Sequence, residues 1–235
     1  VPIHVCGTMK FDQAPPPDAE DKSQLLRETF GEGEHLVWTV GSTHPGEEAL
    51  VADTFAQLKE KVPCLRMVLV PRHHERTAEV ESVLRSKHLS YRRLVPREAN
   101  ASQTDSVDVL LVNTTGELMS FYNVCDIAYV GKSMAGNEGG HNIIEPAIFG
   151  KPVVHGSHME NFRLVAELFR HENGTVEVDS PEALRTAMAE LCSDPDRRRQ
   201  LGERARAVVD MYKGAMDSTI ERLESLLPAI GGASA

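Results

Sequence analysis

The sequence predicts an α/β fold: a doubly wound parallel sheet with helices on both faces. Short apolar runs rich in β-branched residues recur through the middle of the chain, and segments with helical spacing of apolar residues lie between most of them. Strands that alternate with helices are joined by right-handed crossovers, which makes their sheet parallel. The expected strands are residues 36–40, 67–70, 107–112, 127–130 and 152–155.

The two ends of the chain differ from this pattern. A proline-rich stretch at residues 13–18 predicts a stiff linker after the strand-like residues 3–5, so we expect residues 1–12 to be an interdomain tail and residues 13–235 the main domain. From Pro181 onward the pattern is helical, with Ser180 as N-cap and Ser193 or Asp194 capping the next helix. The last segment carries an apolar stripe that would pack on its own sheet or against a second domain: Met216, Ile220, Leu223 and Leu227.

Composition excludes several classes of protein. Lys and Arg number 25 against 35 Asp and Glu, a net charge of −10, which argues against a nucleic-acid surface. No apolar run approaches the roughly 18 residues of a membrane-spanning helix, and the start lacks the parts of a signal peptide, so we expect this chain to be soluble. The cysteines lack CxxC spacing, which favours core thiols in a reducing compartment over a zinc site or disulfides: Cys6, Cys64, Cys125 and Cys192.

Loops that leave the carboxyl ends of parallel strands are the usual place for a ligand. In the first such loop, residues 41–48, small residues allow close approach to the backbone. The loop also fits an ordinary capped helix start. After the second strand, Pro71 fixes the backbone and Arg72 presents a guanidinium that suits a phosphate or a base carbonyl, although an ordinary surface arginine fits equally well. His73 and His74 are adjacent and point apart, so we predict no metal there.

Residues 113–118 follow the third strand with capping oxygens, free amides and a permissive backbone. Such a turn suits a planar base or a ribose, and it also fits an ordinary strand-to-helix connection. The candidate contacts in it are Thr115, Gly116, Glu117 and Leu118.

The most specific local signal is the glycine-rich loop at residues 131–146. Gly139 and Gly140 are expected to expose unpaired amides at a helix start, where the helix dipole favours a phosphate. Three residues past Asn142, Glu145 lies on the same helix face and suits the two hydroxyls of a ribose diol. A structural glycine turn is the alternative. Lys132 is a further candidate phosphate ligand, and His141 either orients a phosphate or caps its helix.

Familiar templates for other functions do not occur in the sequence. GxGxxG and GxxxxGK[ST] are absent, which removes the main support for a dinucleotide oxidoreductase or a P-loop NTPase. Neither Ser133 nor Ser157 has the GxSxG surroundings of a hydrolase nucleophile.

Six segments in one order carry a family resemblance. They are GTMKFD (7–12), GSTHPGEE (41–48), VPRHHER (70–76), GELM (116–119), GGHNIIEP (139–146) and GKPVVHG (150–156). Together they resemble the nucleotide-binding, C-terminal half of the 3-deoxy-D-manno-octulosonic acid (Kdo) transferases of bacterial lipopolysaccharide assembly. The match runs from residue 7 to about residue 169 and departs from the family at KSMAGNE (132–138) and at Ile143-Ile144, which replaces a usual Pro-Leu.

The resemblance implies a Rossmann-like domain, the C-terminal half of a two-domain GT-B glycosyltransferase. In that family the N-terminal domain binds the lipid A precursor and supplies the general base, so no catalytic residue is expected in this chain, and the transfer inverts the sugar carbon without metal or cofactor. CMP-Kdo is the implied donor and CMP the product. The full protein would act at the cytoplasmic face of the inner membrane through its other half. The implied nucleotide contacts are Pro71, Arg72, Thr115, Gly116, Glu117, Leu118, Gly140, His141, Asn142, Ile143, Ile144 and Glu145.

Two other functions stay open on the sequence. Another GT-B enzyme, including a sugar-nucleotide epimerase, would prefer a UDP ligand. A nonenzymatic binding module would bind no nucleotide and would scaffold a partner through the C-terminal apolar stripe.

Overall fold

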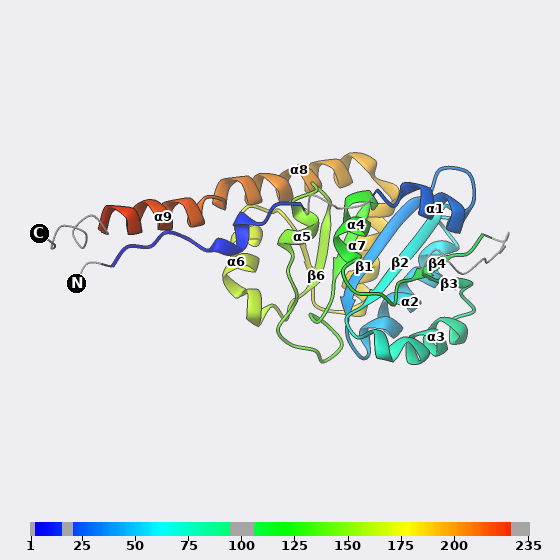
Figure 1. Ribbon diagram of the computed structural model, residues 1–235. Helices are drawn as coiled ribbons and strands as arrows, with labels where there is room; N and C mark the ends of the chain where they lie inside the picture. Colours follow the sequence, from blue (N-terminus) through cyan, green and yellow to red (C-terminus); the bar gives the residue numbers. More distant parts are fainter. Residues whose placement is uncertain (1–2, 16–20, 95–105, 227–235) are drawn as a thin grey trace, which may run out of the picture.

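The centre of the molecule is a parallel sheet with helices on both faces (Figure 1). The computed structural model describes residues 3–15, 21–94 and 106–226. Within these residues the sheet has seven strands in the order β3-β4-β2-β1-β5-β6-β7, and every neighbouring pair is parallel. The strands are β1 (Leu36–Thr43), β2 (Leu65–Pro71), β3 (Tyr91–Arg93), β4 (Val109–Leu111), β5 (Ile127–Val130), β6 (Val153–Gly156) and β7 (Val176–Val178).

All five expected strands are present, and the predicted α/β class is confirmed. Strand β5 has the predicted bounds, β1 continues three residues further to Thr43, and β4 is shorter than the predicted 107–112. The two edge strands, β3 and β7, were not predicted. Their sequences, YRR and VEV, contain no apolar run, because a strand at the edge of a sheet is less buried than a central one.

Helices bury one apolar core on each face of the sheet. One core holds side chains of α2, α3 and α7 together with Leu201 of α8, and the other holds side chains of α1, α4, α5, α6 and the later part of α8. Successive β1 residues divide between the two cores, with Val37 in one and Trp38 in the other, as the period of two requires. The helices are α1 (Ser23–Phe30), α2 (Glu47–Lys59), α3 (Thr77–Ser86), α4 (Leu118–Val124), α5 (Ile144–Ala147), α6 (Arg163–His171), α7 (Pro181–Ser193), α8 (Pro195–Tyr212) and α9 (Ala215–Leu226), with 3-10 turns η1 (Met9–Asp12), η2 (His74–Arg76) and η3 (Glu160–Phe162).

The C-terminal helices begin where the capping residues predicted. Ser180 Oγ accepts a hydrogen bond from the Ala183 amide at 3.2 Å at the start of α7. Asp194, of the two candidates, caps α8 by accepting from the Arg197 amide at 2.9 Å. These bonds satisfy amides that the helix itself leaves without a partner.

The N-terminal segment runs beside the C-terminal helices (Figure 1). Residues 3–5 form no strand and are exposed, so the strand-like reading of that segment is wrong; they pair with no other strand. Further on, Phe11 is fully buried against the rings of Phe169 and Tyr212. Asp12 accepts hydrogen bonds from the amides of Gly214 and Met216 at 2.5 and 2.7 Å. The predicted domain boundary after residue 12 stays a prediction, but residues 9–12 contact this domain directly.

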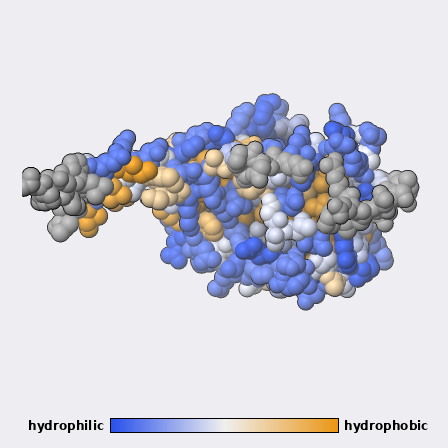
Figure 2. All heavy atoms as spheres, in the orientation of Figure 1, coloured by the Kyte–Doolittle hydropathy of each residue, from blue (hydrophilic) through white to orange (hydrophobic). Residues whose placement is uncertain are grey.

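Helix α9 extends away from the sheet with its apolar stripe exposed (Figure 2). Met216, Ile220 and Leu223 are 46–53% exposed, so the stripe does not pack on its own sheet, and that alternative is wrong. Leu227 and the proline-rich residues 16–18 lie outside the described residues. Docking of the stripe against a second domain stays a prediction.

The cysteines are less uniform than predicted. Cys125 is a buried core thiol, whereas Cys64 is exposed, because it lies on the turn between α2 and β2; Cys6 and Cys192 are partly buried. Among the described residues, no helix combines the length and apolarity that a membrane crossing requires.

Candidate functional site

The site lies where the sheet order reverses. From β1 the chain moves to β2 and β4 on one side, and β5, β6 and β7 lie on the other. A crevice opens at the carboxyl ends of the strands at such a switch point, and open parallel sheets place their ligands there. The loops after β1, β2 and β5 therefore meet at one edge of the sheet.

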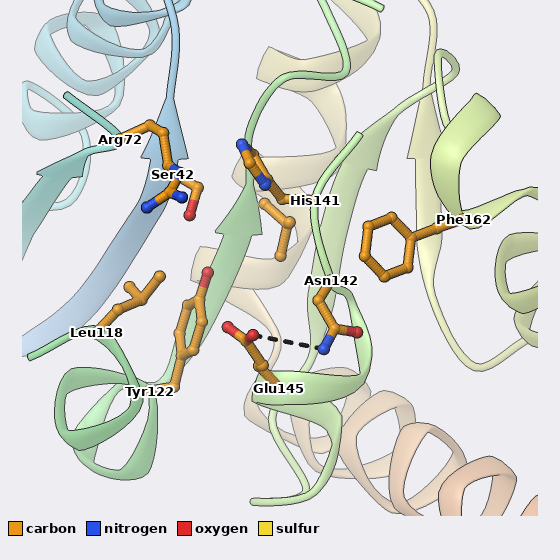
Figure 3. Close-up of a pocket in the computed structure, with 9 residues that line it drawn as sticks. Ser42, Arg72, Leu118, Tyr122, His141, Asn142, Glu145 and Phe162 are labelled. Carbon is orange, nitrogen blue, oxygen red and sulfur yellow. Dashed lines mark hydrogen bonds between the residues drawn. The ribbon is translucent and has the colours of Figure 1, made fainter. Parts of the chain in front are cut away.

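A cavity of about 370 Å³ occupies this edge (Figure 3). Its volume is within the range of small-molecule sites. Arg72, Ser42 and His141 lie at one end of it, and Glu145 with Asn142 lies at the other. The lining residues are Ser42, Arg72, Leu118, Tyr122, Val130, His141, Asn142, Glu145 and Phe162.

Arg72 takes its position from the end of β2. Its amide donates to the Thr43 carbonyl at 3.1 Å, which extends the pairing of β1 with β2 by one residue. Pro71, the last residue of β2, pairs with Thr43 and does not line the cavity. The guanidinium lies at the cavity beside the end of β2 (Figure 3), and its role as a nucleotide contact stays a prediction.

Glu145 is a partly buried carboxylate with few partners. Asn142 donates to it from Nδ2 at 3.4 Å, and the Asn142 Oδ1 accepts from the Ile144 amide at 3.2 Å (Figure 3). Burial raises the pKa of Glu145, while the Asn142 hydrogen bond and the charge of Arg72 oppose that rise. A carboxylate held by one long hydrogen bond retains accepting capacity for the hydroxyls of a ligand. Asn142 also donates to Gln13 Oε1 at 2.9 Å.

The predicted unpaired glycine amides are wrong. The Gly139 amide donates to the Glu160 carboxylate at 2.6 Å, and the Gly140 amide donates to the Lys132 carbonyl at 2.8 Å. Both glycines have positive φ, 110° and 64°, and a Cβ on Gly140 would meet Met159 Sδ at 2.4 Å. The glycines therefore shape a tight structural turn, the alternative that the sequence left open.

The side chains of Ile143 and Ile144 lie in the core. Any contact that these residues make in the cavity would come from their backbone. Helix α5 has only four residues, so its dipole is short.

The turn after β4 contributes one side chain to the cavity, that of Leu118. Thr115 and Gly116 are exposed and lie outside the lining, and Glu117 pairs with Lys22 at 2.9 Å. Tyr122, one turn along α4, lines the cavity beside Leu118, although the sequence reasoning missed it. A Cβ at Gly41 would come within 2.1 Å of the Tyr122 hydroxyl, so glycine there lets α4 approach β1.

Glu47 holds the loops after β1 and β5 together. One carboxylate oxygen accepts from the amides of His44 and Lys132 at 3.0 and 2.7 Å. The other accepts from the amides of Ser133 and Met134 at 3.0 and 3.1 Å and lies 3.2 Å from the Tyr129 hydroxyl. Burial raises the Glu47 pKa against the effect of these donors. The sequence reasoning read Glu47 only as an acid at a helix start.

Two histidines from distant parts of the chain meet beside the cavity. His44 Nε2 lies 3.1 Å from His141 Nε2, and the two rings stack at 5.3 Å. Burial first, and then neighbouring positive charge, lowers the pKa of each to about 4, so both are neutral at pH 7. His44 and His141 stand 97 positions apart, and no spacing in the sequence connects them.

Three further lining residues were not predicted, and each comes from a different loop or strand. Ser42 has a positive φ of 56° where β1 ends, Val130 ends β5, and Phe162 follows β6. A serine, a valine and a phenylalanine at these positions do not by themselves indicate a ligand site in the sequence. Among the described residues, no three His, Cys, Asp or Glu side chains gather as metal ligands would.

Comparison with known proteins places the chain in a family. A family model described as glycosyl transferases group 1 matches residues 49–208. A 3-deoxy-D-manno-octulosonic acid transferase of Haemophilus influenzae is 31% identical over 226 residues, which are 96% of this chain and 52% of that protein. A transferase of the same name from Bordetella pertussis is 32% identical over 95% of this chain and 51% of its own length. The chain thus spans about half the length of these curated relatives.

Among solved structures, the crystal structure of the C-terminal CMP-Kdo binding domain of WaaA from Acinetobacter baumannii is similar to this chain. Its TM-score is 0.69 at 28% identity, and the match covers 80% of this chain and 94% of that one. The parallel sheet matches the C-terminal domains of GT-B glycosyltransferases. The chain therefore belongs to the glycosyl transferases group 1 family, and its resemblance to the C-terminal nucleotide-binding half of the Kdo transferases is confirmed.

Proposed function

We propose that this chain is the donor-binding part of an inverting Kdo transferase and that it binds CMP-Kdo in the cavity between Arg72 and Glu145. The observation that carries the proposal is the division of the cavity, with a cation at one end and, at the other, a partly buried carboxylate that has few hydrogen bonds (Figure 3). A cytidine monophosphate has matching ends, an anionic phosphate and a ribose diol. The solved relative described as a CMP-Kdo binding domain supports the choice of donor.

Each end of the cavity suits one part of the nucleotide. The Arg72 guanidinium offers several N–H donors to phosphate oxygens. The Glu145 carboxylate accepts from two hydroxyls at once, which the cis diol of a ribose provides. Between them, Leu118 and Tyr122 supply an apolar wall for the flat faces of the nucleoside. The backbone of residues 140–144 and of residues 115–117 completes the set of contacts that we propose.

The transfer itself needs groups that we assign to another part of the longer protein. In an inverting displacement a base removes the acceptor proton on the face opposite the leaving phosphate. We assign the base, the lipid A precursor site and the association with the inner membrane to the N-terminal half that the full-length relatives contain. This chain then binds and orients CMP-Kdo without a metal or cofactor, and by itself transfers nothing.

Titration calorimetry with CMP and with UDP tests the proposal. We expect CMP to bind and UDP to bind at least tenfold more weakly, and we expect Arg72→Ala to reduce the affinity for CMP by about tenfold, since it removes a charged hydrogen bond. Arg199→Ala is the matched control, because Arg199 is an exposed arginine on α8 far along the chain from the cavity residues. A preference for UDP would favour another GT-B enzyme, and binding of neither nucleotide would favour a scaffold.

A further inference from the structure

Three imidazoles and two cationic side chains gather at the phosphate end of the cavity. His44 and His141 are joined by their Nε2 atoms at 3.1 Å, and the ring of His73 meets that of His44 edge-on at 5.3 Å. Arg72 and Lys132 act on both paired histidines electrostatically. We call these five residues the imidazole corner. Its positive character contrasts with the net charge of −10 of the whole chain.

The acids that adjoin the imidazole corner are already engaged. Glu47 receives the His44 amide and three amides of the loop after β5, so its charge is spread over backbone donors. Glu48 binds the guanidinium of Arg76, the other cation that acts on His44. Glu75 lies 3.3 Å from His73 Nδ1 and 3.6 Å from His74 Nδ1. The His44–His141 pair therefore stays neutral when the cavity is empty, because burial and like charge both oppose a proton.

An anion in the cavity reverses this balance. It supplies the negative charge that the corner lacks. The neutral pair already holds one proton between its two Nε2 atoms, so an added proton goes to an outer Nδ1. With one proton added, both outer Nδ1 atoms carry hydrogen, so the pair presents a donor toward the cavity from His141, which lines it.

We propose that the His44–His141 pair takes up one proton from solvent when the phosphate end of the donor binds, and that the charged pair then holds this phosphate together with Arg72. The inference rests on the proposed function and deepens it by assigning His44, His141 and His73 to the phosphate end. His141 is the member that faces the ligand, and His44 positions it and shares its proton.

The added charge has a use in the transfer. The phosphodiester of a CMP-sugar carries one negative charge, and the phosphate gains a second when the bond between the sugar carbon and the phosphate oxygen breaks, since the bonding electrons stay on that oxygen. The acceptor proton leaves separately, to the base of the other domain. A positive pair beside the phosphate stabilises the charge that develops there.

The test counts protons by calorimetry at pH 6.5 in two buffers that differ in heat of ionisation. The probe is the methyl ester of CMP, a phosphodiester that has no group titrating near neutral pH, and cytidine is the uncharged control. We expect the diester to bind with uptake of about half a proton or more relative to cytidine, whose own binding reports any proton that Glu145 releases. A diester that binds with the same proton count as cytidine, or with more release, would overturn the inference.

Single substitutions test whether the His44–His141 pair, and not a neighbouring group, takes up the proton. We expect His44→Gln to abolish the proton uptake and to reduce the affinity for the diester about tenfold, while the affinity for cytidine stays unchanged. His141→Gln serves as the second variant, and His74→Gln, an exposed neighbour outside the corner, is the control. Uptake that persists in both His44→Gln and His141→Gln contradicts the inference. If neither cytidine nor the diester binds the wild-type chain, the proposed function itself fails; if both bind with the same proton count, only this inference fails.

Discussion

Two glutamates at the same edge of the sheet, one fully buried and one partly buried, have opposite surroundings. Glu47, at the start of α2, receives four backbone amides and lies within hydrogen-bond distance of a tyrosine hydroxyl. Glu145, in α5, receives one side-chain amide at 3.4 Å. Burial raises the pKa of both. The difference indicates that donors from the protein occupy both oxygens of Glu47, which thereby organises the loops. The Glu145 carboxylate retains hydrogen-bond accepting capacity that a ligand can use.

Replacing Glu47 should give the largest effect. In Glu47→Gln the amide nitrogen would point a donor at backbone N–H groups that need an acceptor, so we expect a loss of about 3 kcal/mol in the free energy of unfolding. That loss corresponds to roughly 6–12 °C in Tm for a domain of this size. Thermal unfolding followed by circular dichroism measures it. Glu138→Gln, an exposed glutamate on the same loop after β5, is the control and should unfold like the wild type; an unchanged Tm in Glu47→Gln would show that Glu47 is not structural.

Replacing Glu145 should separate binding from stability. We expect Glu145→Gln to bind CMP about 10- to 100-fold more weakly, because two hydroxyls lose a charged acceptor. Since the folded-state pKa is raised, the proton is held more tightly in the folded chain, and the stabilising effect of Glu145 is lost as pH rises through that pKa. The variant should therefore be as stable as the wild type, or more so, at pH 7. A lower Tm together with unchanged affinity would reverse the roles that we assign to the two glutamates.

The pH dependence of nucleoside binding sharpens the same point. Cytidine has no phosphate, so its affinity should follow the ionisation of Glu145 and decrease as the pH is lowered through the raised pKa of that carboxylate. Titrations with cytidine at several pH values measure this decrease. In Glu145→Gln the affinity should be lower and constant over that range, and an equal slope in both proteins would assign the dependence to another group.

Asn142 should give the smallest effect. Its Nδ2 donates to both Glu145 and Gln13, so Asn142→Ala removes a side-chain donor that orients the carboxylate. We expect CMP affinity to fall by about fivefold, the value of one hydrogen bond of about 1 kcal/mol. Gln200→Ala, an exposed amide on α8, is the control. A loss as large as that of Glu145→Gln would mean that Asn142 binds the nucleotide itself.

Much of the fold could be predicted from the sequence, because buried strands carry their signal locally. Residues 127–130 are apolar on both faces, and the strand has these bounds in the structure. The edge strand β3 reads YRR and carries no such signal. Caps were also predictable, since Ser180 and Asp194 bond to amides only three residues away.

The site was predictable where a strand end fixes a residue and unpredictable where distant residues meet. Arg72 follows β2 directly, so its place at the cavity was foreseen. The Gly139 amide was expected to be free, but Glu160 reaches it from 21 positions further along the chain. The contact between His44 and His141 is of the same kind. Both depend on the packing of separate loops, which no local pattern encodes.

The most direct test of the account is a crystal structure of this chain with CMP. We predict the nucleotide in the cavity at the sheet edge, with its phosphate within hydrogen-bond distance of Arg72 and its ribose hydroxyls on Glu145. A nucleotide bound on another face of the sheet, or one whose ribose makes no contact with Glu145, would contradict the account.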